Sequence, residues 1–294
     1  MAWEIAVAGT VTLDDVVTPQ GSASAQQGGS AVYFALAASR YAPVHAVGAV
    51  GADGVDSLRT TFEGCSVSRE GVVQSPEPTM HWWARHDFVR WVTADERTEQ
   101  GAYDAWRPVL PPAAAAAPVL FAGSMRPDLQ LAVLRQSRAR LVGSDSMTVY
   151  IGSRGDDVRA VAEASDILFL NRTELSALTG HPSAAWLDAA RSLCGRGRLR
   201  AVVVKAGPVG AAVVTSSSVV ERAAHPVETV MDPTGAGDSL AGGFLGACAR
   251  AERDDEGFFP HALDEGLRCA ADAIVAFGTQ VLRRRSTTAH LVPD

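Results

Sequence analysis

The sequence has almost no lysine. Lys205 is its single lysine among 294 residues, and the other basic residues are arginines. Lysine and arginine together number 26 against 33 aspartates and glutamates, which gives a formal net charge of −7. A chain with this balance lacks the basic excess that attracts nucleic acid or an anionic membrane. We therefore expect neither as a partner.

Cysteine is also scarce. Its four positions are far apart and form no C-x-x-C pair: Cys65, Cys194, Cys248 and Cys269. This spacing excludes a disulfide scaffold or a zinc ribbon and is typical of a reducing compartment. No apolar run approaches the roughly 20 residues of a membrane span, and Ile5 to Ala8 indicates a first strand and no secretory leader. We expect a cytoplasmic protein.

Three common site motifs are missing. No G-x-x-x-x-G-K-[ST] occurs, which excludes a P-loop enzyme, and no H-E-x-x-H occurs, which disfavours a zinc hydrolase. The pair Gly235 and Gly237 fails the dinucleotide fingerprint, because Leu240 stands where a small residue is required.

Short apolar runs alternate with helical patterns, which predicts a mostly parallel sheet flanked by helices. We interpret residues 1–294 as a single α/β domain, because no linker divides them. Strands are predicted at Glu4–Gly9, Val44–Val50, Pro118–Ala122, Arg140–Ser144, Asp166–Leu170, Ala201–Lys205, Ala211–Thr215 and His225–Met231. Helices are predicted at Ser30–Tyr41, Pro127–Gln136, Asp156–Ala164, Thr173–Thr179, Ala184–Cys194, Ser239–Ala251 and Ala262–Phe277.

Residues 72–100 break this rhythm, because they are β-forming without a following helix. Three of the six tryptophans lie here: Trp82, Trp83 and Trp91. Neighbouring residues of a strand point to opposite faces, so Trp82 and Trp83 cannot both line one site. One of them either stacks on a ligand or seals two layers together.

The most informative stretch is Asp232-Pro233-Thr234-Gly235-Ala236-Gly237-Asp238, which opens an Ala/Leu/Phe-rich helix. A helix start carries unpaired N–H groups and positive partial charge, so Gly235, Ala236 and Gly237 predict a hole for phosphate or an oxyanion. Asp238 in the first turn is placed to take a proton from an attacking hydroxyl. A tight connection with no catalytic role is the alternative.

This stretch resembles the C-terminal signature of the ribokinase-like (PfkB) carbohydrate and nucleoside kinases. Further motifs agree in order: Gly28-Gly29-Ser30-Ala31, Val47 to Gly54, Asn171-Arg172-Thr173-Glu174, and Val202 to Gly207 followed by Gly210. The resemblance spans roughly residues 4–280. It implies a ribokinase-like fold with a small β-sheet lid, formed by about residues 11–25 and 72–100.

For the nucleotide, the resemblance implies that Lys205, Gly207 and Gly210 border ATP, with the helix around Cys269–Ala273 beside the adenine. Asn171 and Glu174 would organise Mg²⁺ through water, although Asn-x-x-Glu is also a helix-capping pattern. Asp232 and Thr234 stand where relatives form a monovalent-cation loop.

For the acceptor, the resemblance implies that Asp14 binds hydroxyl groups, with Asp15 as its rival. Gly28 and Gly29 would let the acceptor approach the backbone, and Trp82 would line its site. Tyr33 departs from the family pattern, because many relatives have asparagine there. We expect Tyr33 in the wall of a site that is not shaped for free ribose or fructose; the alternative is a core position.

The predicted function is ATP- and Mg²⁺-dependent phosphorylation of a hydroxyl on a small sugar or sugar-like acceptor. Two acceptor classes stay open, a nucleoside and a cyclitol or secondary-metabolite glycoside. A catalytically inactive protein that binds a sugar or nucleotide is the alternative of a different class. A homodimer formed through the lid also stays open.

Overall fold

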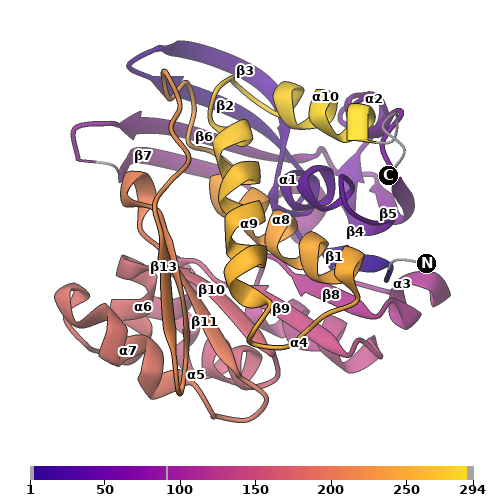
Figure 1. Ribbon diagram of the computed structural model, residues 1–294. Helices are drawn as coiled ribbons and strands as arrows, with labels where there is room; N and C mark the ends of the chain where they lie inside the picture. The colour runs from indigo at the N-terminus through magenta and orange to yellow at the C-terminus, as the bar shows by residue number, and fades with distance from the viewer. Residues whose placement is uncertain (1–2, 91, 290–294) are drawn as a thin grey trace.

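The computed structural model describes residues 3–90 and 92–289, and within these ranges the strands form two sheets (Figure 1). In spatial order the nine-stranded sheet contains β13 (Val219–Arg222), β12 (Ala211–Thr215), β11 (Ala201–Lys205), β10 (Ile167–Asn171), β9 (Leu141–Asp145), β8 (Val119–Ala122), β1 (Ile5–Ala8), β4 (Val44–Gly51) and β5 (Val67–Ser75). All neighbours from β11 to β5 pair in parallel, and β12 and β13 add two antiparallel strands at one edge.

Helices cover both faces of this sheet, which is why its central strands are apolar throughout. One face carries α1 (Ser30–Ala38), α2 (Val55–Phe62), α8 (Ala236–Ala251), α9 (Phe259–Ala273) and α10 (Gln280–Ala289). The other carries α3 (Pro112–Ala116), α4 (Pro127–Gln136), α5 (Thr148–Glu163), α6 (Arg172–Thr179) and α7 (Trp186–Leu193). Short 3₁₀ turns occupy Gly101–Tyr103, Ser183–Ala185 and Gly207–Val209. In the described part of the chain, no helix is long and apolar enough to cross a membrane.

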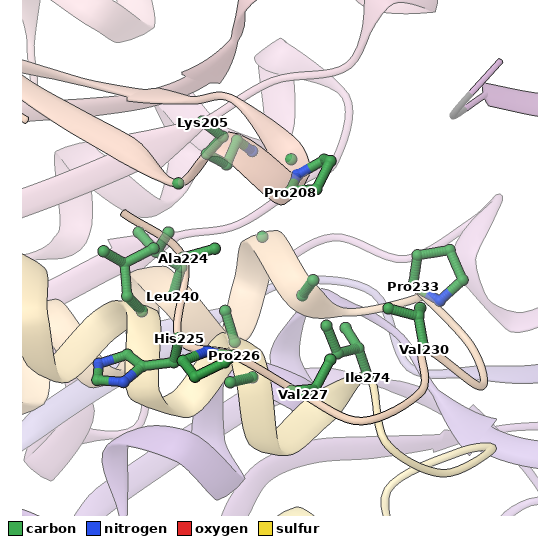
Figure 2. Close-up of a pocket in the computed structure, with 17 residues that line it drawn as sticks. Lys205, Pro208, Ala224, His225, Pro226, Val227, Val230, Pro233, Leu240 and Ile274 are labelled. Carbon is green, nitrogen blue, oxygen red and sulfur yellow. The ribbon is translucent and has the colours of Figure 1, made fainter. Parts of the chain in front are cut away.

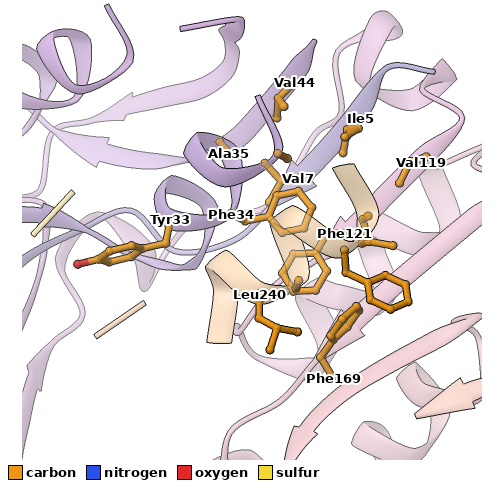
Figure 3. Packing of buried hydrophobic residues seen from close by; sticks show 14 of the residues in the cluster. Ile5, Val7, Tyr33, Phe34, Ala35, Val44, Val119, Phe121, Phe169 and Leu240 are labelled. Atoms are coloured by element: carbon orange, nitrogen blue, oxygen red, sulfur yellow. The ribbon is translucent and has the colours of Figure 1, made fainter. Parts of the chain in front are cut away.

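A row of phenylalanines fixes the first of these helix layers to the sheet (Figure 3). Phe34 of α1 stacks on Phe121 of β8 with ring centroids 4.4 Å apart. Phe121 meets Phe169 of β10 edge-on at 6.0 Å, and Phe169 meets Phe244 of α8 edge-on at 5.6 Å. All four rings are buried. Offset and edge-on ring pairs of this kind favour one relative orientation of their elements, so the row orients α1 and α8 on the sheet.

The second sheet is formed by β3 (Gly21–Gly28), β2 (Thr12–Thr18), β6 (Met80–Asp87) and β7 (Val92–Glu99), in that order. We call it the lid sheet. Its central pair, β2 and β6, is parallel, whereas β2–β3 and β6–β7 are antiparallel. The predicted α/β fold, with a mostly parallel sheet and a smaller second sheet, is confirmed.

Several predicted elements are wrong in detail. The expected lid segment 72–100 begins too early, because Val72–Ser75 belong to β5, which pairs with β4 in the large sheet. The other segment, 11–25, ends too early, because β3 continues to Gly28. Helices α2, α3 and α10 are additional to those predicted. Helix α5 starts eight residues before the expected Asp156 and has a break at Arg154 (φ −144°, ψ 42°).

The strand predicted at His225–Met231 is also wrong, because β13 is the strand in this region and ends at Arg222. Pro226 has no N–H to donate to a ladder. The N–H groups of Met231 and Asp232 donate instead to the carbonyl of Ile274, just beyond α9, at 2.8 and 3.3 Å.

The phenylalanine row yields a stability prediction. Phe121→Ala should lower the free energy of unfolding by about 3–5 kcal/mol, because it leaves a cavity between two other rings in a buried cluster. Urea denaturation followed by circular dichroism measures this change. Val89→Ala is the control and should change stability little, because Val89 is 93% exposed. A loss below about 1 kcal/mol for Phe121→Ala would contradict the assigned role of the row.

Candidate active site

Polar residues gather where the parallel strands of the large sheet end. Asp145, Asn171 and Lys205 are the last residues of β9, β10 and β11. Asn171 pairs with Lys205 in register, and Phe169 pairs with Asp145, so the three side chains share one edge of the sheet. Ligands of open α/β sheets bind at this carboxyl edge.

The turn that opens α8 lies at the same edge. Gly235 precedes the helix with φ 74°, a left-handed conformation that favours glycine. A Cβ atom on Gly235 would also lie 2.2 Å from the ring of Tyr33. The Tyr33 side chain of α1 points away from the phenylalanine row (Figure 3), and its buried ring lies against the turn at Gly235.

Different residues of this turn border two cavities. Pro233, Ala236 and Gly237 border a cavity of about 400 Å³, the apolar cavity. Its other lining residues are Lys205, Gly207, Pro208, Gly210, Ala224, His225, Pro226, Val227, Val230, Leu240, Leu267, Ala270, Ala271 and Ile274. Lys205 and Pro208 lie across this cavity from Pro226, Val227 and Ile274 (Figure 2). It therefore has a cationic side and an apolar side.

Thr234, Gly235 and Asp238 border a second cavity of about 390 Å³, the polar cavity. Its other lining residues are Thr10, Thr12, Asp14, Gly29, Ser30, Tyr33, Met80, Trp82, Glu96, Thr98, Gln100, Ser124, Met147, Val149 and Tyr150. The lid sheet contributes several of them, from β2, β6 and β7. One short turn thus separates the two cavities and presents the start of α8 to both.

Lys205 is the cation of this region. Its Nζ lies 4.0 Å from Glu174 Oε2 and 3.0 Å from the position that a Gly237 Cβ would take. Burial lowers the pKa of Lys205, but Glu174, Asp145 and Asp238 outweigh that effect, so its pKa is raised overall. The lysine therefore stays charged beside the first turn of α8, where glycine leaves it room.

Asp238 and Asp145 are held in an environment that disfavours their ionised forms. Burial raises the pKa of Asp238 to about 6, although Lys205 acts in the opposite direction. Burial and the charge of Asp238 raise the pKa of Asp145 well above its usual value. Oδ1 of each carboxyl group is buried and accepts no hydrogen bond from the described residues. Asp238 borders the polar cavity and is thus available to a ligand there, whereas Asp145 borders neither cavity.

The structure distinguishes Asp14 from its rival Asp15. Asp14 borders the polar cavity and is 3% exposed, whereas Asp15 accepts a hydrogen bond from the N–H of Ala25 and borders a groove on the other face of the lid sheet. Burial raises the pKa of Asp14 to about 7, with smaller contributions from the charges of Asp232, Asp15 and Asp238 and an opposing one from the Thr12 hydroxyl. Gly28 does not border the cavity; a Cβ there would lie 1.9 Å from Asp14 Oδ2, so it makes room for this carboxyl group.

Asn171 and Glu174 form a capping box at the start of α6. Asn171 Oδ1 accepts from the N–H of Glu174 at 2.8 Å, and Glu174 Oε2 accepts from the N–H of Asn171 at 2.7 Å. Neither residue borders the two cavities. Among the described residues, no three His, Cys, Asp or Glu side chains converge to hold a metal ion. The predicted Mg²⁺ site stays a prediction, and it fits this chemistry, since Mg²⁺ is usually held by one or two carboxylates, waters and substrate phosphates.

Some site residues were not predicted. Asp145 and the lid residues Glu96, Thr98 and Gln100 are among them, as is the segment Ala224–Val230. Trp82 borders the polar cavity. Trp83 stacks on His81 with ring centroids 3.8 Å apart and borders the groove on the other face of the lid sheet, which we call the outer groove. Trp91 lies outside the described residues. In α9, Ala270 and Ala271 border the apolar cavity, whereas Cys269 contacts Arg40 and Tyr41.

Comparisons with known proteins agree with this geometry. The family model for the pfkB family carbohydrate kinases matches residues 4–288. This chain belongs to that family. A cytidine kinase of Thermococcus kodakarensis is 28% identical over 261 residues, which cover 86% of this chain and 91% of the relative.

Solved structures show the same fold. An adenosine kinase of Sinorhizobium meliloti has a TM-score of 0.78 at 17% identity and covers 95% of both chains. An aminoimidazole riboside kinase of Salmonella enterica, complexed with aminoimidazole riboside and an ATP analogue, has a TM-score of 0.75 at 21% identity; the match covers 97% of this chain and 99% of that one. As a pfkB family member, the protein is a phosphotransferase with a hydroxyl group as acceptor.

The raised pKa of Asp14 yields a prediction about stability. Asp14→Asn should raise the free energy of unfolding at pH 8 on the order of a few kcal/mol, because the folded protein then holds no buried charge there. Since the folded-state pKa of about 7 lies above the usual 3.8, the gain should be absent below pH 4, grow up to pH 7 and stay constant above it. Urea denaturation at pH 5 and pH 8 measures it. Asp56→Asn, at an exposed carboxylate, is the control; equal stability of Asp14→Asn and wild type at pH 8 would contradict the prediction.

Proposed function

We propose that this pfkB family protein phosphorylates a sugar hydroxyl of a nucleoside or a closely similar riboside. The observation that supports this choice is the mixed lining of the polar cavity. Asp14, Thr12 and Asp238 offer acceptors for sugar hydroxyls, whereas Trp82, Met147 and Tyr150 offer flat or apolar surface. A free sugar has no large apolar face to match these side chains, but a nucleoside base has one.

The relatives support the same acceptor class. The names of the cytidine kinase, the adenosine kinase and the aminoimidazole riboside kinase all specify a riboside that carries a heterocycle. A ribokinase from Arabidopsis thaliana complexed with ribose and ATP also has this fold, with a TM-score of 0.74. Free sugars therefore remain the second candidate.

ATP is proposed to bind in the apolar cavity. Its base would contact the side formed by Val227, Ile274 and α9, and its phosphates would approach Lys205 and the N–H groups of Ala236 and Gly237. The helix start and the lysine both attract phosphate oxygens. Mg²⁺, when bound with the nucleotide, would neutralise further phosphate charge.

Asp238 is proposed to be the general base. It borders the polar cavity, next to the turn whose other side faces the apolar cavity. The acceptor oxygen would form a bond to the γ-phosphorus while the bond to the bridging oxygen of ADP breaks, and the hydroxyl proton would move to Asp238. A pKa of about 6 keeps this carboxylate ionised at neutral pH yet close enough to accept a proton.

An acceptor screen tests the proposed substrate class. Purified protein with Mg-ATP should release ADP with cytidine, adenosine or aminoimidazole riboside at a kcat/KM about tenfold or more above that for ribose, fructose or myo-inositol, because the partly exposed rings of Trp82 and Tyr150 can contact the base. A higher kcat/KM for a free sugar would overturn the nucleoside assignment. Binding of Mg-ATP without turnover of any acceptor would support an inactive binding protein.

Replacing the proposed base tests the mechanism. Asp238→Asn should reduce kcat about 10²–10⁴-fold, because the amide cannot accept the proton, while it retains the shape of the side chain. The kcat of the wild type should fall as the pH drops below about 6, since Asp238 must be ionised. Rates measured on an acceptor identified in the screen decide this, with Asp56→Asn as the exposed control. A near-normal kcat for Asp238→Asn would remove Asp238 from this role.

A further inference from the structure

We propose that His86 and Thr18 are positioning residues that fasten the lid sheet to the turn between the two cavities. These contacts hold the turn in place whichever acceptor the protein phosphorylates. We call the four residues Met231 to Thr234, which lead into Gly235, the approach segment.

Two lid strands contact the approach segment through buried side chains. His86 of β6 places Nε2 3.1 Å from Thr234 Oγ1 and 3.8 Å from Asp232 Oδ1. The Thr18 hydroxyl of β2 donates to the carbonyl of Met231 at 2.9 Å. His86 and Thr18 are 9% and 6% exposed.

The two contacts act at one level of the lid sheet. The parallel pairing of β2 with β6 aligns Val17 with Arg85. Thr18 and His86 are the next residue on each strand, so both reach the body of the protein from the same end of the sheet. The lid sheet therefore holds the approach segment at both of its ends.

The approach segment also makes hydrogen bonds to the end of α9 and within itself. The N–H groups of Met231 and Asp232 donate to the carbonyl of Ile274, and the N–H of Thr234 donates to Asp232 Oδ1 at 2.9 Å. Ile274 and Pro233 border the apolar cavity, whereas Thr234 borders the polar cavity. The segment thus lies between the lid sheet and the wall of the apolar cavity.

The chemistry of His86 favours a donating Nε2. An ionised carboxylate has no proton to donate, and a hydroxyl oxygen can accept a hydrogen bond. An N–H at Nε2 therefore faces two acceptors, Asp232 Oδ1 and Thr234 Oγ1. Nδ1 lies 3.4 Å from Thr93 Oγ1 of β7, whose hydroxyl can donate to it. The imidazole therefore connects three elements: β7, β6 and the approach segment.

This connection has a mechanical consequence. Any displacement of the lid sheet that breaks the contacts of His86 and Thr18 leaves buried polar groups without partners, which is costly. The lid sheet and the approach segment should therefore move together. The start of α8 is then held in place by the lid sheet, other residues of which border the polar cavity.

Hydrogen exchange of the ligand-free protein tests the proposal without any acceptor. We would measure deuterium uptake by mass spectrometry in peptides that cover residues 228–240. His86→Phe keeps a ring but removes the hydrogen bonds, and it should speed exchange of the protected amides there roughly two- to tenfold. His86→Gln keeps an N–H near the position of Nε2 and should restore slower exchange.

Thr18 gives an independent pair of variants. Thr18→Val removes the hydroxyl and should speed exchange in the same peptides, whereas Thr18→Ser keeps it. Serine also keeps the acceptor for the N–H of Gln20, which Thr18 binds at 3.1 Å. If His86→Phe fails to fold, this pair still decides the matter. Arg85→Ala is the matched control, because the Arg85 side chain is largely exposed and borders the outer groove.

Calorimetry supplies the second measurement. Binding of the Mg complex of adenosine 5′-(β,γ-imido)triphosphate should weaken roughly two- to tenfold in His86→Phe and Thr18→Val, and remain unchanged in Arg85→Ala. If the variants lower only the melting temperature, with wild-type exchange in residues 228–240 and wild-type analogue affinity, the proposal is overturned. Equal exchange in His86→Gln and His86→Phe would also overturn it, because the hydrogen bond would then not be the cause.

Discussion

The conformation of the backbone at Gly235 is the constraint on which the rest of the site depends. Its φ of 74° and the ring of Tyr33, 2.2 Å from where a Cβ would lie, leave no room for a side chain. Tyr33 is itself fixed, because the neighbouring Phe34 stacks on Phe121 of the central sheet. Two residues further on, the ammonium group of Lys205 lies beside Gly237, in space that a side chain at this position would restrict. The start of α8 is therefore held between an aromatic ring and a cation before any ligand arrives, and the N–H of Ala236 also donates to the carbonyl of Pro233 at 3.3 Å. Such preorganisation is what an anion site requires.

The sheet edge, the α8 turn and the facing lid sheet place three buried carboxyl groups in one region, and burial makes ionisation of each of them less favourable. Burial raises the pKa of Asp238 to about 6 and that of Asp14 to about 7, and it also raises the pKa of Asp145. Each shift means that ionisation of the carboxyl group is less favourable in the folded protein than in the unfolded chain. An apolar residue at these positions would avoid that cost, so the carboxyl groups are better explained by ligand chemistry than by stability. The phenylalanine row lies beneath the edge, and its burial offsets part of the cost.

Sequence reasoning was most successful where a site is local in the chain. A helix start was predicted at residues 235–238, and α8 begins there at Ala236, although the strand predicted before it at His225–Met231 is wrong. The sequence left Asp14 and Asp15 as rivals, because which one faces the cavity depends on the space that Gly28 leaves. Asp145 could have been found, because Ser144-Asp145-Ser146 follows a buried strand. No local pattern could identify His86, because its contact with Thr234 spans 148 residues. The segment His225–Met231 has the composition of a strand, yet its hydrogen bonds go to Ile274 because the fold brings the end of α9 there.

The two cavities are bordered by different elements. The groups proposed for phosphoryl transfer therefore lie on other elements than most of the residues that would select the acceptor. The groups proposed for phosphoryl transfer lie on the sheet edge and the α8 turn, where the phenylalanine row and Tyr33 fix them. Much of the polar cavity is instead bordered by the lid sheet and by Met147, Val149 and Tyr150 at the start of α5. The break at Arg154 divides α5, whose first part packs on the sheet through Ile151 and whose second part does so through Val158 and Ala162. Apart from Tyr33, which contacts the turn at Gly235, the side chains that border the polar cavity can therefore change while His86 and Thr18 still hold the approach segment. A fold arranged in this way can keep one phosphoryl-transfer turn while its acceptor changes, which is the physical reason that the family signature identifies the reaction more closely than the substrate.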